Sequence, residues 1–334
     1  MKMKFTPSHI IKYTLPVLIG CLFFFSTIHY NICNGQSQEF ERAEDSLKKY
    51  IHKVHFGITD QEKYENNELF IKTMNRVLSD ERSFKYPFDS LVNIAKLYAP
   101  DDKFRIINWN LPLENGTHEY YGFIQVKGSG DLEYRVYQLI DKSAEIESPE
   151  NMLLTTDRWY GALYYKIIQH KVKDKNYYTL LGWDGNNLMS KKKLIDVLSF
   201  KTSGKPQFGA GVFKKYRDKD KVVRIIFEYS ARATMTLRYE KQYMHVIAQS
   251  KDKKTQKDKV KIEPMIVFDN LIPLDTRLSP DHPDLIGQYQ FYVPETNVLN
   301  GFILIDGRWY FVRDIDARNP KAPKRKKVSG ADKP

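Results

Sequence analysis

The sequence predicts a mainly β protein, an antiparallel sandwich or irregular propeller-like body preceded by a short N-terminal helical segment. Beyond residue 100, short runs rich in β-branched and aromatic residues recur along the chain. Turn-forming residues separate these runs, and Asp306-Gly307 is a strong hairpin signal because a type I′ turn needs positive φ at both central positions. Helical spacing of apolar residues is confined to 36–100. Many short strands joined by tight turns favour antiparallel sheets.

The first 35 residues have the anatomy of a secretory signal peptide. Three lysines precede an apolar core over 13–28, and a polar run ends at Gly35. The core is shorter than the roughly 20 residues that span hydrocarbon. We therefore expect cleavage after Gly35 and no transmembrane span in the mature chain; lipidation of Cys21 and an uncleaved anchor are the alternatives. Cys21 and Cys33 are the only cysteines, so cleavage would exclude disulfides and thiolate chemistry.

Residues 36–100 are predicted to form the helical segment. Apolar residues within 40–54 and within 69–78 recur at helical spacing. A third short helix is predicted to begin near Pro87, because proline suits the first helical turn, and to end before Pro100.

Residues 101–316 are predicted to form the antiparallel β domain. Turn motifs such as Gly128-Ser129-Gly130-Asp131 separate its strands. The predicted strands are 104–109, 120–126, 132–140, 159–168, 177–183, 194–200, 222–229, 235–239, 243–248, 262–268, 288–293, 302–305 and 309–313.

The net charge of +12 does not belong to the predicted β domain as a whole. The leader carries +3, the segment 251–261 carries +4 and the tail 317–334 carries +6, which leaves −1 for all other residues. A nucleic-acid-binding protein clusters basic residues on its folded surface, so we expect no nucleic-acid partner. We interpret 317–334 as a basic disordered tail; a tether to acidic lipid or polysaccharide is the alternative.

The segment following the predicted strand 177–183 is the most polar candidate site. Asp184, Asn186 and Asn187 supply side-chain oxygens that suit a hard cation. A calcium loop of the EF-hand type needs a carboxylate at its twelfth position, where Ile195 stands. A turn is the preferred interpretation, and no metal is expected.

Tryptophans beside acidic residues suggest sugar binding, because an exposed indole ring stacks on the apolar face of a pyranose. Core packing is the alternative for aromatic residues on strands. The candidate ligand-binding residues are Trp183, Asp184, Asn186, Asp306 and Trp309.

Motifs of the common catalytic classes are missing from the sequence. It contains no Gly-x-Ser-x-Gly, no His-Glu-x-x-His and no phosphate-binding Gly-x-x-x-x-Gly-Lys-Ser/Thr, and no cofactor is expected. A glycoside hydrolase would need two carboxylates about 5–10 Å apart. The acids considered for that role are Asp157, Asp184, Glu228, Asp306 and Asp314.

Three segments resemble exported β-rich proteins of Bacteroidota that have no assigned activity: Asn34–Gln38, Phe104–Trp109 and Tyr178–Asn186. The resemblance implies a location in the periplasm or outer envelope of a Gram-negative bacterium. We expect an exported binding or scaffolding protein without catalytic activity, with an envelope glycan, an acidic lipid or another envelope protein as its partner. The alternative is a polysaccharide-active enzyme, glycoside hydrolase-like, that uses a carboxylate pair.

Overall fold

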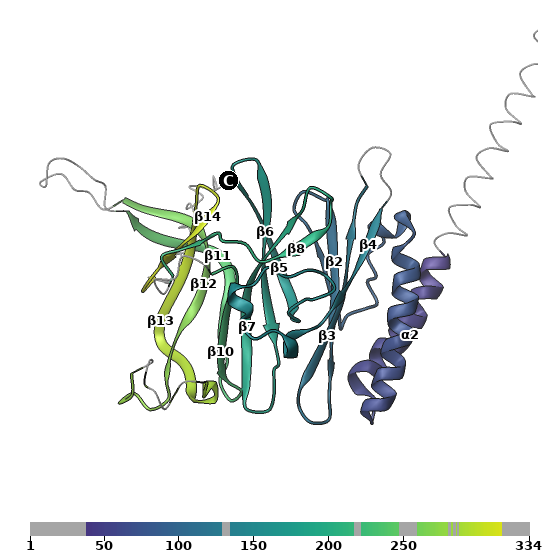
Figure 1. The fold of residues 1–334 in the computed structure, drawn as a ribbon, viewed down its shortest axis with the longest axis horizontal. Coiled ribbons are helices and arrows are strands. Elements are labelled where there is room, and N and C mark those ends of the chain that lie inside the picture. The colour runs from purple at the N-terminus through teal and green to yellow at the C-terminus, as the bar shows by residue number, and fades with distance from the viewer. Residues whose placement is uncertain are drawn as a thin grey trace, which may run out of the picture. The chain divides into compact units, whose positions relative to one another are not determined.

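The computed structural model of the chain describes residues 38–128, 134–216, 222–246, 259–279, 282, 285 and 287–315. The predicted leader, the basic tail and residues 251–258 of the lysine-rich segment lie outside the described residues. The chain divides into two compact units at Asn93 and Ile94. The described part of the first unit is helical, and that of the second holds the strands (Figure 1). Within the described ranges, no helix is both long and apolar enough to cross a membrane.

The first unit contains a helix over 38–56, the helix α2 (Asp60–Leu78) and the 3-10 helix η1 (Glu81–Lys85). The helix α2 begins at Thr59, whose hydroxyl accepts a hydrogen bond from the backbone N–H of Glu62 at 3.2 Å. The apolar positions that predicted these two helices are largely buried, so the helical spacing is confirmed.

The third helix predicted near Pro87 is wrong. Residues 86–94 form turns and irregular backbone, and Ala95–Tyr98 forms the strand β1. That segment pairs antiparallel with the next strand along the chain, from Ala95 opposite Asn108 to Tyr98 opposite Arg105. Over so short a run, the spacing of the apolar residues fits both the helical and the strand period. Pairing with the neighbouring strand then provides partners for the backbone N–H and C=O groups.

The described residues of the second unit form three sheets. The first has the order β1-β2-β3-β4, the second has β10-β7-β6-β5 with β8 beside β7, and the third has β11-β12-β13-β14-β9. All pairs are antiparallel except the short parallel pair of β14 and β9. The remaining bounds are β2 (Phe104–Pro112), β3 (His118–Val126), β4 (Arg135–Ile140), β5 (Leu163–Val172), β6 (Lys175–Asp184), β7 (Ser190–Phe200), β8 (Pro206–Phe208), β9 (Phe213–Lys214), β10 (Ile225–Ser230), β11 (Leu237–Val246), β12 (Lys259–Pro273), β13 (Tyr292–Ile305) and β14 (Arg308–Val312), with 3-10 turns η2 (Ser143–Glu145), η3 (Pro149–Asn151) and η5 (Tyr289–Phe291).

The second sheet is the middle layer of this unit (Figure 1). One of its faces packs on the first sheet, through residues such as Tyr178 and Leu180 against Phe104. Its other face packs on the third sheet, through residues such as Ile195 and Phe227. Because neighbouring side chains of a strand point to opposite faces, cover on both faces explains the unbroken runs of buried residues in β6 and β7.

The predicted fold class is confirmed: the described chain is mainly β, with a short N-terminal helical segment. Every predicted strand overlaps an observed one, but two pairs of predicted runs fall in single strands. The runs 235–239 and 243–248 overlap β11, and the runs 288–293 and 302–305 overlap β13, although Tyr289–Phe291 forms a 3-10 turn. The predicted hairpin at Asp306-Gly307 is confirmed, because both residues have positive φ, 47° and 75°. The strands β1, β8 and β9 were not predicted, because each has only two to four residues.

Candidate functional site

The site begins with Asp184, the last residue of β6, whose side chain is buried. Its Oδ1 accepts hydrogen bonds from the Tyr120 hydroxyl at 2.9 Å and from the backbone N–H of Asn186 at 2.7 Å. The Tyr120 hydroxyl also accepts the backbone N–H of Gly185 at 2.8 Å. These bonds satisfy a carboxylate that would otherwise be costly to bury, and they hold the turn after β6 against β3.

Asn186 connects Asp184 to a second carboxylate, that of Glu228 on β10. The side-chain amide of Asn186 donates to Glu228 Oε1 at 3.0 Å and to the Ser190 hydroxyl at 2.7 Å. The Ser190 hydroxyl in turn donates to the same Glu228 oxygen. The left-handed backbone of Asn186, with φ of 49°, allows this reach. Two carboxylates from different strands therefore share one asparagine.

Lys192 on β7 lies between these acids. Its Nζ is 3.7 Å from Asp184 Oδ2 and 3.3 Å from the Tyr160 hydroxyl oxygen, to which it donates. Burial lowers the pKa of Lys192, but Tyr160, Asp184 and Glu228 raise it by more, so the amine stays protonated at neutral pH. Burial raises the pKa of the Tyr160 hydroxyl, which stays neutral.

Two cavities adjoin this cluster, and Tyr160 and Lys192 line both of them. The smaller has a volume of about 600 Å³ and is lined by both polar and apolar residues of β3, β4 with the turn after it, and the end of β6. It includes His118, whose Nδ1 lies 3.0 Å from the side-chain amide of Asn110, and whose pKa is lowered mainly by burial.

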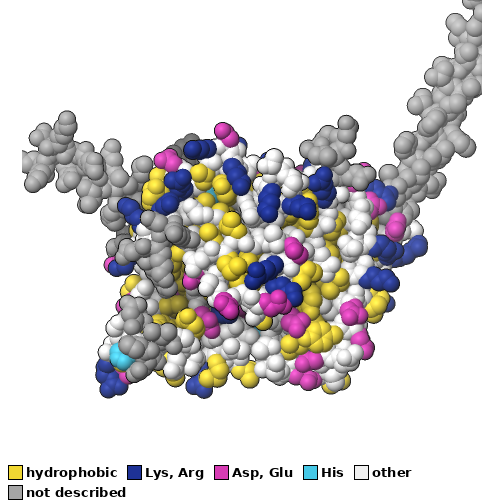
Figure 2. Space-filling model, in the orientation of Figure 1, with side chains coloured by type: hydrophobic (Ala, Val, Ile, Leu, Met, Phe, Trp, Pro, Cys, Tyr) yellow, Lys and Arg dark blue, Asp and Glu magenta, His cyan; other side chains and the backbone are white. Residues whose placement is uncertain are grey.

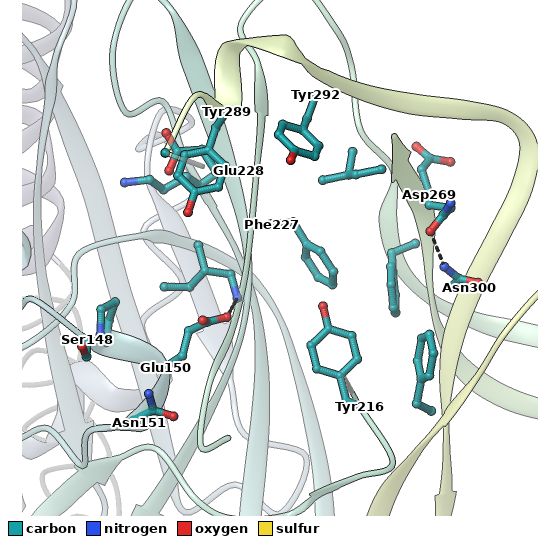
Figure 3. A pocket seen from close by; sticks show the side chains of 18 of the residues that line it. Ser148, Glu150, Asn151, Tyr216, Phe227, Glu228, Asp269, Tyr289, Tyr292 and Asn300 are labelled. Atoms are coloured by element: carbon teal, nitrogen blue, oxygen red, sulfur yellow. Dashed lines mark hydrogen bonds between the residues drawn. The ribbon is translucent and has the colours of Figure 1, made fainter. Parts of the chain in front are cut away.

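The larger, which we call the aromatic cavity, has a volume of about 1410 Å³ and opens between β10 and the third sheet. Glu150 and Glu228 line one side of this cavity, whereas Asp269 and Asn300 line the opposite side (Figure 3). Its aromatic lining residues are Tyr160, Tyr216, Phe227, Phe268, Tyr289, Tyr292 and Phe311.

The loop that carries Glu150 is tied to the middle sheet. The backbone carbonyl of Glu150 accepts the N–H of Val223 at 2.8 Å, and its carboxylate accepts the N–H of Ile226 at 3.4 Å. The guanidinium of the buried Arg224 donates to the carbonyl of Pro149 at 2.5 Å. Glu150 is therefore held against β10, close to the strand that carries Glu228.

The sequence candidates divide between two places. Three of them, Trp183, Asp184 and Asn186, lie together at the end of β6. Trp183 is half-buried, its ring centre lies 5.6 Å from that of His118, and it lines neither cavity. Asp306 is exposed at the hairpin turn between β13 and β14. Trp309 is fully buried, and its indole N–H donates to Thr179 Oγ1 at 2.8 Å. It is a core residue, so its ring is not a surface for a sugar.

The residues that line the cavities were mostly missed. Tyr160, Lys192 and Glu150 come from a loop, the middle of a lysine run and a 3-10 turn, and no local pattern connects them. The one sequence feature that could have indicated Lys192 is the run Lys191-Lys192-Lys193. Side chains alternate between the two faces of a strand, so the middle lysine must lie on the face opposite to its two neighbours.

Among the described residues, no group of three or more His, Cys, Asp and Glu side chains is arranged to hold a metal ion. The arrangement offers instead both hydrogen-bond donors, on Lys192 and Tyr160, and acceptors, on Asp184 and Glu228, next to aromatic rings. Searches against protein-family models, curated proteins and solved structures find no match.

Proposed function

We propose that the chain is an exported, non-enzymatic binding protein of a Gram-negative cell envelope whose ligand is a carbohydrate in the aromatic cavity. The observation that carries the proposal is the meeting of Lys192 and Tyr160 with an aromatic-lined cavity. Sugar hydroxyls both donate and accept hydrogen bonds, and the apolar faces of a pyranose suit aromatic rings. Binding pockets typically combine an apolar lining with a few convergent polar groups. Export depends on the leader pattern, which lies outside the described residues.

The unused hydrogen-bonding capacity of the cluster supports this ligand class. Among the described residues that line the aromatic cavity, Glu228 accepts its hydrogen bonds at Oε1 alone, and the Tyr160 hydroxyl proton has no acceptor. Lys192 has three N–H donors and one protein acceptor within hydrogen-bond distance. Buried polar groups normally find partners, and a polyhydroxyl ligand would supply both kinds.

The test is a thermal-unfolding screen of the purified protein against neutral and charged glycans. At a hundredfold excess over Kd, binding stabilises the native state by about 2.7 kcal/mol, which raises Tm by about 5–11 °C for a domain of this size. The absence of a shift with every glycan would contradict the proposal.

A matched pair of variants tests the location of the site. Tyr289 and Phe291 are aromatic residues two positions apart, both 43% exposed, but only Tyr289 lines the aromatic cavity. We expect Tyr289→Ala to weaken glycan binding about tenfold, which corresponds to about 1.4 kcal/mol, and Phe291→Ala to leave it unchanged. Equal effects of the two substitutions would show that the glycan binds elsewhere.

A polysaccharide-active enzyme is the second candidate, because Glu150 and Glu228 line the same cavity. The Glu150 carboxylate accepts the backbone N–H of Ile226, two residues before Glu228 on β10. Glycoside hydrolysis needs two carboxylates about 5–10 Å apart. Release of reducing ends from a bound polysaccharide, abolished by Glu228→Gln, would support the enzyme; turnover that survives in Glu228→Gln or its absence from the wild type would exclude this pair.

A further inference from the structure

The described residues that line the aromatic cavity carry an excess of negative charge. Only two of them are basic, the half-buried Lys192 and the exposed Arg313, whereas five are acidic, two of them exposed. Figure 2 shows acidic side chains among hydrophobic ones in the lower middle of the face drawn, whereas many Lys and Arg side chains lie toward its upper edge. The lining carboxylates are Glu147, Glu150, Glu228, Asp269 and Asp314.

Lys192 offsets part of this charge at Glu228, but no close ion pair among the described residues neutralises the lining carboxylates. Within the described chain, none of the five carboxylates forms a salt bridge with a basic side chain. Their hydrogen-bond partners are neutral: Asp269 Oδ2 accepts the backbone N–H of Thr236 at 2.6 Å, and Glu150 accepts that of Ile226. A cleft lined by one sign of charge between low-dielectric walls concentrates its field on the ligand.

Two further observations indicate a ligand rather than a merely solvated acidic surface. Tyr160 is only 5% exposed, lines the cavity, and has a hydroxyl proton without an acceptor among the described residues. The aromatic side chains of Tyr216, Phe227 and other residues line the same space, and the faces of such rings attract organic cations.

From these observations we infer that the ligand is an amino-sugar chain with free, protonated amines. This inference depends on the proposed carbohydrate function and makes it more specific. Lys192 is a resident cation beside Asp184 and Glu228. Glu150 and Asp269, on opposite sides of the cavity (Figure 3), are left to pair with ligand ammonium groups.

The experiment compares two ligands that differ in charge at each amine, a glucosamine oligomer and its fully N-acetylated counterpart of the same length. Calorimetric titration of the purified protein is expected to give a Kd about tenfold lower for the glucosamine oligomer, from two charge contacts at partly exposed groups. The preference should weaken as salt is raised. Equal affinity for the two oligomers would overturn the inference and leave carbohydrate binding standing. Failure of both to bind would also overturn it, and the glycan screen would then decide the proposed function separately.

A double variant tests the two acids directly. Glu150→Gln with Asp269→Asn removes both charges but keeps oxygen acceptors for Ile226 and Thr236, and unchanged thermal unfolding would confirm that the variant is folded. We expect it to lose the tenfold preference. The control is Asp306→Asn, which removes an exposed carboxylate that lines neither cavity and should keep the preference. A preference that persists in the double variant would refute the assignment of these acids.

Discussion

Removal of Asp196 should destabilise the β unit more than removal of any surface charge. Asp196 on β7 and Arg224 before β10 form an ion pair in which the Arg224 Nε to Asp196 Oδ2 distance is 2.9 Å and both side chains are fully buried. The same carboxylate oxygen accepts the Tyr164 hydroxyl at 2.9 Å, and that hydroxyl accepts the indole N–H of Trp159 at 3.0 Å. Asp196→Ala would leave the Arg224 charge buried without its carboxylate.

Breaking a buried pair in this way costs about 3–5 kcal/mol, because the remaining charge has lost its solvent and its partner. With an m-value for urea of about 2.5 kcal/mol/M, the midpoint of unfolding should fall by about 1–2 M. Intrinsic tryptophan fluorescence is the appropriate signal, because all four tryptophans lie in the second unit.

Two controls separate the cause from general damage. Asp275→Ala removes an exposed pair of similar length, Arg277 Nη2 to Asp275 Oδ2 at 2.7 Å, and should leave the midpoint unchanged. The double variant Asp196→Leu with Arg224→Met replaces the pair by apolar groups and should recover most of the lost stability. A midpoint within 0.3 M of wild type for Asp196→Ala, about 0.8 kcal/mol, would refute this account. A double variant as unstable as the single one would show that the uncompensated charge is not the cause.

Three further predictions concern a buried histidine, a glycine and a helix cap. The His170 ring forms two hydrogen bonds, between Nδ1 and the Gly307 carbonyl at 2.8 Å and between Nε2 and Thr179 Oγ1 at 2.9 Å. Burial lowers the pKa of His170 more than the Gly307 bond raises it. The unfolded chain therefore binds the proton more readily than the folded one. The stability that neutral His170 contributes is therefore complete above the unfolded pKa of about 6.5. It falls as the pH drops below that value, by about 1.4 kcal/mol for each unit between the folded and unfolded pKa values. Urea midpoints measured between pH 8 and pH 5 should decline less steeply in His170→Gln than in the wild type, and an unchanged slope would contradict this. Gly307→Ala should lower the free energy of unfolding by about 1–3 kcal/mol, because Gly307 has φ of 75° and an added Cβ would collide with the Lys171 carbonyl. The control is Gly211→Ala, since the space around Gly211 is open. Equal Tm values for the two variants would contradict the predicted strain. Thr59→Ala should destabilise the helical unit by about 1 kcal/mol, because the hydroxyl that caps α2 is lost. The helical signal in far-UV circular dichroism should then disappear at a lower temperature than in the wild type, whereas Thr59→Ser should keep the wild-type transition. If the two variants unfold alike, the hydroxyl does not stabilise α2.

Part of the candidate site was accessible from the sequence. Asp184 and Asn186 were identified because polar, turn-forming residues follow an apolar strand, and they do lie at the end of β6. Trp309 was chosen for a different reason, because tryptophans beside acidic residues suggest sugar binding and Asp306 is near it in the sequence. Its full burial depends on the packing of the third sheet on the middle one, which a local pattern of aromatic and acidic residues does not reveal.

The sequence by itself determined the strand-rich composition, the first two helices, the turn at Asp306-Gly307 and the separation of basic charge from the rest of the chain. These features depend on side-chain shape, backbone freedom and charge within a few neighbouring residues. Only the tertiary structure decided that β6 and β7 are covered on both faces, and that Glu150, Tyr160 and Lys192 meet. Such meetings depend on pairing and packing between distant segments, such as those of Thr179 and Trp309, which are 130 positions apart. Many arrangements of such segments share the same local preferences, and the buried contacts select one of them.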